Sequence, residues 1–215
     1  MDDNVIKKLE EFFLKFPKYE YKKGEIIIQA TGNPQGIFYI ESGIVRRYYL
    51  SENGEEVTLN LYKPHAFLPM SWAIGNVTNT HFYEAMTPVV VNRAPREEVI
   101  LFLKKEPDVV YDLLRRIYIG MEGLWMHLES LTAGNSYTKL VASLVVLAKR
   151  FGKKEENGLM VDLKMSERDL ANYAGMSRET ASRELQKLRK EKYVTFDKGI
   201  IIVHDIQKME DLLLR

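Results

Sequence analysis

Hydrophobic and polar positions alternate in different ways along the N-terminal half of the chain. Residues 4–16 carry apolar side chains at helical spacing, and Pro17 closes the helix that this spacing predicts. From Tyr19 to about Pro95, short runs rich in Ile, Val, Tyr and Phe alternate with turn signals, including the hairpin signal Asn53-Gly54. Many short strands at close spacing predict a small antiparallel barrel or sandwich. The predicted strands cover residues 25–29, 36–40, 44–50, 56–62, 81–86 and 88–93.

The most regular feature is an apolar repeat that follows a short predicted helix at 96–105. Pro107 suits the first turn of the next helix, and the apolar positions after it are separated alternately by four and three residues. This heptad pattern predicts a helix over 107–131, about 37 Å long, with an apolar seam. A long core helix is the alternative, but a strict repeat between two differently patterned regions favours a dimer contact. The seam consists of Val110, Leu114, Ile117, Met121, Leu124, Leu128 and Leu131.

Gly134-Asn135 interrupts the helical pattern and predicts a hinge or a helix C-cap. A second amphipathic helix is expected over 137–150, and residues 152–158 are expected to form a charged loop. We therefore place a domain boundary near 133–137.

Residues 166–194 have the pattern of two short helices joined by a tight turn. Ser166 is placed as the N-cap of the first helix, with Asp169 three residues later, and Gly175 ends that helix. Ser177 caps the second helix, which directs Ala181, Leu185 and Leu188 inward. Two β-prone runs, 193–196 and 200–203, then flank the turn at 197–199. This order predicts a winged helix-turn-helix rather than an ordinary helical hairpin.

The exposed face of the second helix has the chemistry of a DNA reader. An arginine can donate to guanine O6 and N7, and a glutamate can accept from cytosine N4. The N-terminal end of a recognition helix reaches the base edges, whereas hydroxyl groups and lysines around it suit phosphates. We predict base contacts from Arg178, Glu179, Ser182 and Arg183, and backbone contacts from Ser166, Ser177, Thr180, Lys187 and Lys190.

The segment Met176-Ser-Arg-Glu-Thr-Ala-Ser-Arg-Glu-Leu closely resembles the recognition helix of the Crp/Fnr family of bacterial transcription regulators. Ile37-Phe-Tyr-Ile-Glu-Ser-Gly-Ile-Val resembles the β-roll signature of that family, and Asn135 falls at its interdomain hinge. The resemblance implies an α+β fold of two domains. A sensor β-roll with flanking helices would occupy 1–106, a dimerisation helix and hinge 107–135, and a winged helix-turn-helix 136–215.

The same resemblance implies a homodimer that binds palindromic double-stranded DNA with a TGA-like core in each half-site. Ser182 and Arg183 beside Glu179 are more similar to the Fnr branch than to the rest of the family. RNA polymerase is the partner implied if the protein is an activator.

The nucleotide pocket of that family is not preserved in this sequence. The family has a Gly-Glu pair and an Arg-Ser pair, where this chain has Pro69-Met70 and Asn79-Thr80. A buried phosphate without an arginine partner is costly, so we expect weak or absent cyclic AMP binding. The region could instead hold an apolar effector or be filled with core side chains. The candidate effector residues are Met70, Trp72, Asn79, His81, Tyr83, Leu124 and Trp125.

The composition excludes several kinds of cofactor, metal and catalytic site. The 215 residues contain no cysteine, which excludes an iron–sulfur cluster, a thiolate metal site and a catalytic cysteine. No metal site or cofactor is expected, although His65, His81 or His127 leave haem open in principle. The sequence contains no run of about 18 apolar residues, so it predicts no membrane helix. The acidic N-terminus is unlike a signal peptide. A cytoplasmic protein without membrane contacts is therefore expected.

The net charge of +1 is the sum of an acidic N-terminal part and a basic C-terminal part. Residues 1–135 hold 15 Lys+Arg and 18 Asp+Glu, whereas residues 136–215 hold 16 Lys+Arg and 12 Asp+Glu. A basic C-terminal part suits DNA binding.

The sequence contains no phosphate loop, nucleophile elbow or histidine cluster, which are the motifs that would indicate an enzyme such as a barrel metalloenzyme. The alternatives that stay open are a dimeric β-roll sensor of haem or a small apolar ligand, and an adaptor whose helix-turn-helix contacts proteins.

Overall fold

The computed structural model describes residues 2–213, and in the long helix the side chains of residues 127 and 130–133 lie outside the described part. The sequence-based assignments of His127 and Leu131 fall on those side chains. The chain forms two compact units, the first ending at Tyr118 and the second beginning at Ile119. Antiparallel sheets dominate the first unit and a helix-turn-helix the second, which confirms the predicted two-domain α+β fold.

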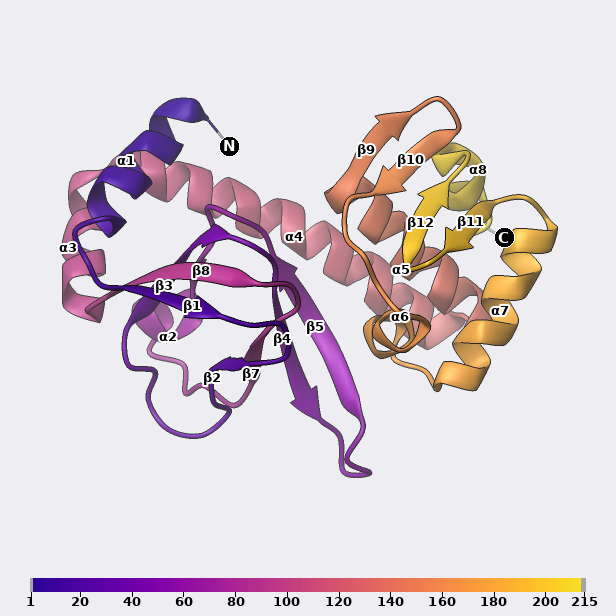
Figure 1. The fold of residues 1–215 in the computed structure, drawn as a ribbon, viewed down its shortest axis with the longest axis horizontal. Helices are drawn as coiled ribbons and strands as arrows, with labels where there is room; N and C mark the ends of the chain where they lie inside the picture. The colour runs from indigo at the N-terminus through magenta and orange to yellow at the C-terminus, as the bar shows by residue number, and fades with distance from the viewer. Residues whose placement is uncertain (1, 214–215) are drawn as a thin grey trace. The chain divides into compact units, whose positions relative to one another are not determined.

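The first unit contains two four-stranded antiparallel sheets, ordered β1-β8-β3-β6 and β2-β7-β4-β5 (Figure 1). Both sheets contribute to one buried apolar cluster, with Phe38 and Ile40 from one sheet and Val45 and Tyr83 from the other. The two sheets therefore face each other across this cluster, as in a β-roll. The strands are β1 (Lys18–Tyr21), β2 (Ile26–Ile28), β3 (Ile37–Ser42), β4 (Val45–Leu50), β5 (Glu56–Tyr62), β6 (Phe67–Leu68), β7 (Phe82–Ala85) and β8 (Val89–Ala94).

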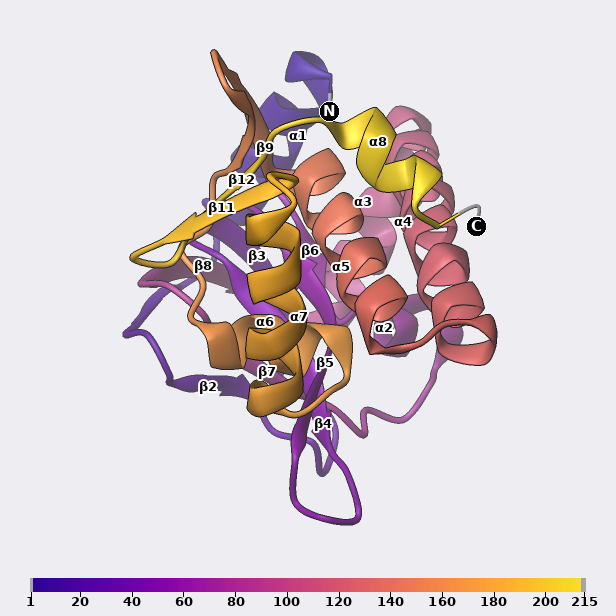
Figure 2. The same ribbon diagram turned by 90° about the vertical axis from the view of Figure 1, so that its right-hand side faces the viewer.

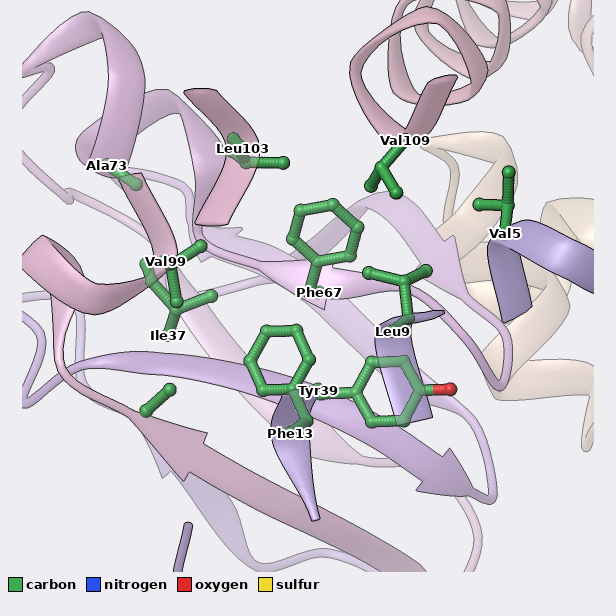
Figure 3. Close-up of a cluster of buried hydrophobic side chains, with 11 residues drawn as sticks. Val5, Leu9, Phe13, Ile37, Tyr39, Phe67, Ala73, Val99, Leu103 and Val109 are labelled. Carbon is green, nitrogen blue, oxygen red and sulfur yellow. The ribbon is translucent and has the colours of Figure 1, made fainter. Parts of the chain in front are cut away.

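Strand β3 is buried on both faces because helices cover the side that the second sheet leaves free. Alternate residues of a strand point to opposite faces, so Ile37 and Tyr39 leave the inter-sheet cluster and join another. In that second cluster the ring of Phe13 stacks on Tyr39 with centroids 4.9 Å apart, and Phe67 packs beside them (Figure 3). The covering helices are α1 (Asp3–Phe13), α2 (Met70–Gly75), α3 (Arg96–Lys105) and the start of α4 (Pro107–Ala133).

Helix α5 (Ser136–Phe151) forms the centre of the second unit. It is buried along most of its length and packs against the other helices and against a sheet ordered β11-β12-β10-β9 (Figure 2). The side chain of Asn135 caps α5 by accepting from the backbone N–H groups of Tyr137 and Thr138. The other elements are β9 (Gly152–Glu155), β10 (Gly158–Val161), α6 (Glu167–Ala174), α7 (Arg178–Lys190), β11 (Val194–Asp197), β12 (Ile200–Val203) and α8 (Ile206–Asp211).

The prediction of a charged loop at 152–158 is wrong. Residues 152–155 form the edge strand β9, which pairs with β10 through its backbone. Its side chains beyond Gly152 are exposed, so no apolar alternation in the sequence indicates a strand. The short elements β1, β6, α2 and α8 were also not predicted, since each has too few residues to establish a period.

Candidate nucleic-acid interface

Helix α6 begins with a reciprocal cap. The side chain of Ser166 accepts from the backbone N–H of Asp169 at 3.1 Å, and the carboxylate of Asp169 accepts from the backbone N–H of Ser166 at 2.8 Å. At the other end Gly175 adopts a left-handed conformation with φ of +64°. This turn leads directly into α7, so the two predicted helices of the motif and the predicted tight turn are confirmed.

Helix α7 is fixed by a cap at its start and by an apolar inner face. The Oγ of Ser177 accepts from the backbone N–H of Thr180 at 3.2 Å and donates to the Oγ1 of Thr180 at 3.1 Å. Ala181, Leu185 and Leu188 are buried, as their spacing predicted. Because both hydroxyl groups already serve the cap, they hold the first turn of α7 in place.

The outer face of α7 carries the residues predicted to contact bases. Arg178, Glu179 and Arg183 are exposed, and Ser182 is half-buried. The pKa of the Glu179 carboxyl is lowered by a backbone N–H group and by the Ser177 hydroxyl, so this side chain is an anionic acceptor at neutral pH. The structure therefore brings together two cationic donors, one acceptor and one hydroxyl on the first two turns of a helix.

Glu184 is a charged residue on the inner face of α7, and sequence analysis did not single it out. Its carboxylate accepts from Ser136 Oγ at 3.1 Å, from Arg183 Nε at 3.1 Å and from Lys187 Nζ at 2.6 Å. Two of these donors are predicted DNA contacts. The signal was present in the sequence, because Glu184 lies three residues after Ala181 and four before Leu188, in the apolar stripe.

The hairpin β11–β12 follows α7 and confirms the predicted wing. Its turn carries two left-handed residues, Lys198 with φ of +47° and Gly199 with φ of +84°. The backbone N–H of Met165 donates to the carbonyl of Gly199 at 2.9 Å. The wing turn is thus tied to the residue that precedes the cap of α6.

The described residues of the predicted seam are all at least partly exposed along α4. Their exposed fractions are 47% for Leu114, 48% for Ile117 and 51% for Leu124, which are high for leucine and isoleucine. Val110 and Leu128 are exposed as well, and Met121 is half-buried. An apolar stripe of this kind on a long helix is a typical protein contact surface.

The predicted effector residues of the first unit do not form one group. Met70 and Trp72 lie on α2 and pack against the cluster under α1 and α3, whereas Tyr83 belongs to the inter-sheet cluster. Asn79 is buried and donates to the carbonyls of Gln29 at 2.7 Å and His81 at 2.9 Å. Asn79 thus holds backbone at the position where the nucleotide-binding pattern has arginine. Leu124 and Trp125 are exposed on the part of α4 that belongs to the second unit.

The two described histidines of the first unit both have side-chain partners. The Nδ1 of His65 lies 2.8 Å from the hydroxyl of Tyr39, and Arg47 contacts the Nδ1 of His81 at 2.9 Å. Among the described side chains, which leave out residues 127 and 130–133, no three His, Asp or Glu gather in a way that could hold a metal ion. No helix within residues 2–213 is long and apolar enough to cross a membrane.

Comparison with known proteins agrees with this arrangement. Residues 138–212 match the Crp-like helix-turn-helix domain, and residues 18–106 match the cyclic nucleotide-binding domain. The global nitrogen regulator of Nostoc sp. is 31% identical over 176 residues, which cover 80% of this chain and 79% of that protein. The chain belongs to the Crp/Fnr family of transcription regulators. The anaerobic regulatory protein of Haemophilus influenzae is a more distant relative, 23% identical over 98% of this chain and 78% of that protein.

Solved structures of this family share the fold. A CRP/FNR-family transcriptional regulator from Thermus thermophilus matches with a TM-score of 0.70 and 23% identity, over 93% of this chain and 99% of that one. A CooA variant from Carboxydothermus hydrogenoformans matches with a TM-score of 0.76 and 19% identity, over 98% and 90%. This regulator therefore has the architecture of the family.

Proposed function

We propose that this Crp/Fnr-family regulator binds a palindromic DNA site as a homodimer, with α7 in the major groove and a TGA-like core in each half-site. The observation that carries the proposal is the outer face of α7, where Arg178, Glu179 and Arg183 are exposed on a helix whose N-terminus is fixed by a cap. A rigid helix with donors and an acceptor at its N-terminal end suits direct readout of base edges.

Each side chain of the interface has a role in this proposal. Arg178 and Arg183 donate to guanine, Glu179 accepts from cytosine, and Ser182 adds a hydroxyl contact. Backbone contacts come from the cap residues Ser166, Ser177 and Thr180 and from the exposed lysines Lys187 and Lys190.

The homodimer rests on α4. A heptad seam that is exposed on a single chain is covered when a second α4 packs in parallel beside it. A two-fold axis along such a pair places both recognition helices at the same end, as a palindrome requires. The relatives are transcription regulators and not enzymes, and RNA polymerase is the further partner if this protein activates transcription.

We also propose that cyclic AMP is not the effector and that the protein needs no cofactor to bind DNA. Asn79 is occupied by two backbone carbonyls, and an amide supplies no charge for a cyclic phosphate. If an effector exists, it is of another chemistry, and it acts by binding one state of the dimer better than the other.

Selection of bound duplexes from a random DNA library by the full-length protein tests this function. The expected result is enrichment of a two-fold symmetric site with TGA and its complement, and a repeat with a cell metabolite extract tests effector dependence. Arg178→Ala should weaken the enrichment and relax the preference at one base pair of each half-site, whereas Lys208→Ala on α8 is a matched loss of charge that should do neither. If the wild-type protein enriches no particular DNA sequence, the result contradicts the proposal and favours an adaptor.

A further inference from the structure

Glu184 is a buried carboxylate that faces two of the proposed DNA contacts. Only 2% of its surface is exposed, yet it lies on a helix whose other charged side chains are exposed. A buried charge is costly unless it is fully paired, and Glu184 meets this condition through Ser136, Arg183 and Lys187. Burial raises the pKa of its carboxyl, but the donors from Lys187, Arg183 and Ser136 outweigh burial, so the pKa lies below its ordinary value.

The contact with Arg183 leaves the reading end of that side chain free. Glu184 accepts from Nε, at 3.1 Å, and this bond uses neither of the two terminal nitrogens of the guanidinium. Those two nitrogens are the ones that form a bidentate pair with guanine O6 and N7. An arginine already held in one orientation loses less conformational entropy when it binds.

The same carboxylate reduces the positive charge that DNA phosphates meet. Lys187 is paired with Glu184 at 2.6 Å, and Arg183 shares the same anion. Non-specific binding comes almost entirely from cationic side chains that neutralise phosphates. Pairing Lys187 and Arg183 within the protein therefore weakens contact with arbitrary DNA while it prepares one base contact.

We propose that Glu184 is a specificity-determining positioning residue, which orients Arg183 for base readout and reduces the positive charge that Arg183 and Lys187 present to arbitrary DNA. The inference rests on the proposed DNA-reading function and names a residue that sharpens it. Both effects act in the same direction, because each increases the ratio of operator binding to non-specific binding.

Glu191 offers a matched control at the end of the same helix. Its carboxylate accepts from the hydroxyl of Tyr137 at 2.8 Å, so it also joins α7 to the first turn of α5. Glu191 is exposed, and its backbone N–H donates to the carbonyl of Lys187 at 2.9 Å. No contact of its carboxylate with the side chain of Arg183 or Lys187 is described in the structure. Glu191→Gln therefore removes one negative charge and weakens one bond to α5 without changing the setting of Arg183.

The test compares full-length wild-type, Glu184→Gln and Glu191→Gln on a selected operator, on its single-base variants and on a random duplex, at several salt concentrations. Arg183→Ala first identifies the base pair that Arg183 reads. Glu184→Gln should tighten binding to the random duplex and make that binding more dependent on salt, by about one phosphate contact. It should also reduce discrimination at the base pair that Arg183 reads about tenfold. Glu191→Gln should leave that discrimination unchanged.

Ser136→Ala separates this role from a structural one. It removes a bond to Glu184 without changing any charge, so it should lower the unfolding midpoint but not the discrimination. The inference is overturned if Glu184→Gln, shown to be folded by circular dichroism, keeps full discrimination at that base pair or weakens all duplexes equally. If the wild-type protein itself prefers no sequence, the proposed function fails instead, so the two failures are distinguishable.

Discussion

A Cβ atom on Gly43 would overlap the carbonyl oxygen of Pro88 and come within 2.8 Å of the Cγ2 of Val89. Gly43 also has φ of +86°, a conformation that L-residues rarely adopt. The turn between β3 and β4 therefore packs against the start of β8 with no space for a side chain. Two separate costs follow for any substitution here, one from the backbone and one from the clash.

Gly43→Ala should lower the free energy of unfolding by about 2–5 kcal/mol, as a left-handed alanine costs about 1–2 kcal/mol and overpacking about 1–3 kcal/mol. Gly32 is the matched control, because its φ is +88° but no atom lies within 4 Å of a Cβ placed there. Gly32→Ala should therefore show only the backbone cost. Urea unfolding of both variants measures the difference, and equal losses would contradict the role of Pro88.

Arg178→Ala should weaken operator binding by about 1–3 kcal/mol and relax discrimination at one base pair of each half-site. Lys190→Ala should instead weaken binding to all duplexes alike and reduce the salt slope by about one, since a phosphate contact carries no sequence information. Fluorescence anisotropy on the operator and its single-base variants measures both effects. The assignment of Arg178 is wrong if its loss weakens every duplex to the same degree.

Ile117→Glu should convert the proposed homodimer into monomers, because it places a charge in the seam of α4. Ile119→Glu makes the same substitution two residues later on the same helix, at an exposed position outside the seam. It should leave the dimer intact. Sedimentation equilibrium measures the mass, and loss of the dimer should also weaken operator binding. A dimeric Ile117→Glu protein would mean that another surface mediates association.

The pKa of His81 is lowered from 6.5 by burial and by the neighbouring Arg47. The unfolded chain therefore binds a proton more readily than the folded one, and this histidine costs stability as the pH falls through about 6.5. The loss is complete once the pH is below the lowered pKa. His81→Gln should lose less stability than wild-type between pH 7.5 and pH 5.5, as measured by urea midpoints. Parallel losses in the two proteins would exclude His81 as the cause.

The helix-turn-helix could be predicted almost residue by residue because its signals are local. A cap joins Ser166 to Asp169, a left-handed glycine ends α6, and apolar residues recur at three and four positions along α7. The same is true of the long helix α4 and of the hairpins of the β-roll, whose turns contain Asn53-Gly54 and Ser42-Gly43. Each of these signals acts between residues that are a few positions apart.

The features that prediction missed depend on partners far away in the sequence. The edge strand β9 is defined by its pairing with β10 and not by its own exposed side chains. The sequence groups Met70 and Trp72 with Tyr83, but in the structure they lie on the opposite side of the sheet that contains β3. Asn79 donates a hydrogen bond to the carbonyl of Gln29, 50 residues away. The sequence shows that asparagine replaces the arginine of the nucleotide-binding pattern, but it does not show this contact.

The amino-acid sequence was thus sufficient to predict the class of fold, helix α7 and the residues on its outer face. Helical periodicity and caps depend on interactions between residues that are only a few positions apart. The apolar stripe of α7 places Glu184 on the inner face, but only the folded chain reveals that Glu184 pairs with Ser136, 48 residues away, while it holds Arg183 and Lys187. The free energy of a buried charge depends on every donor around it. Arg183 and Lys187 lie on α7 itself, but Ser136 joins them only when α5 and α7 pack together.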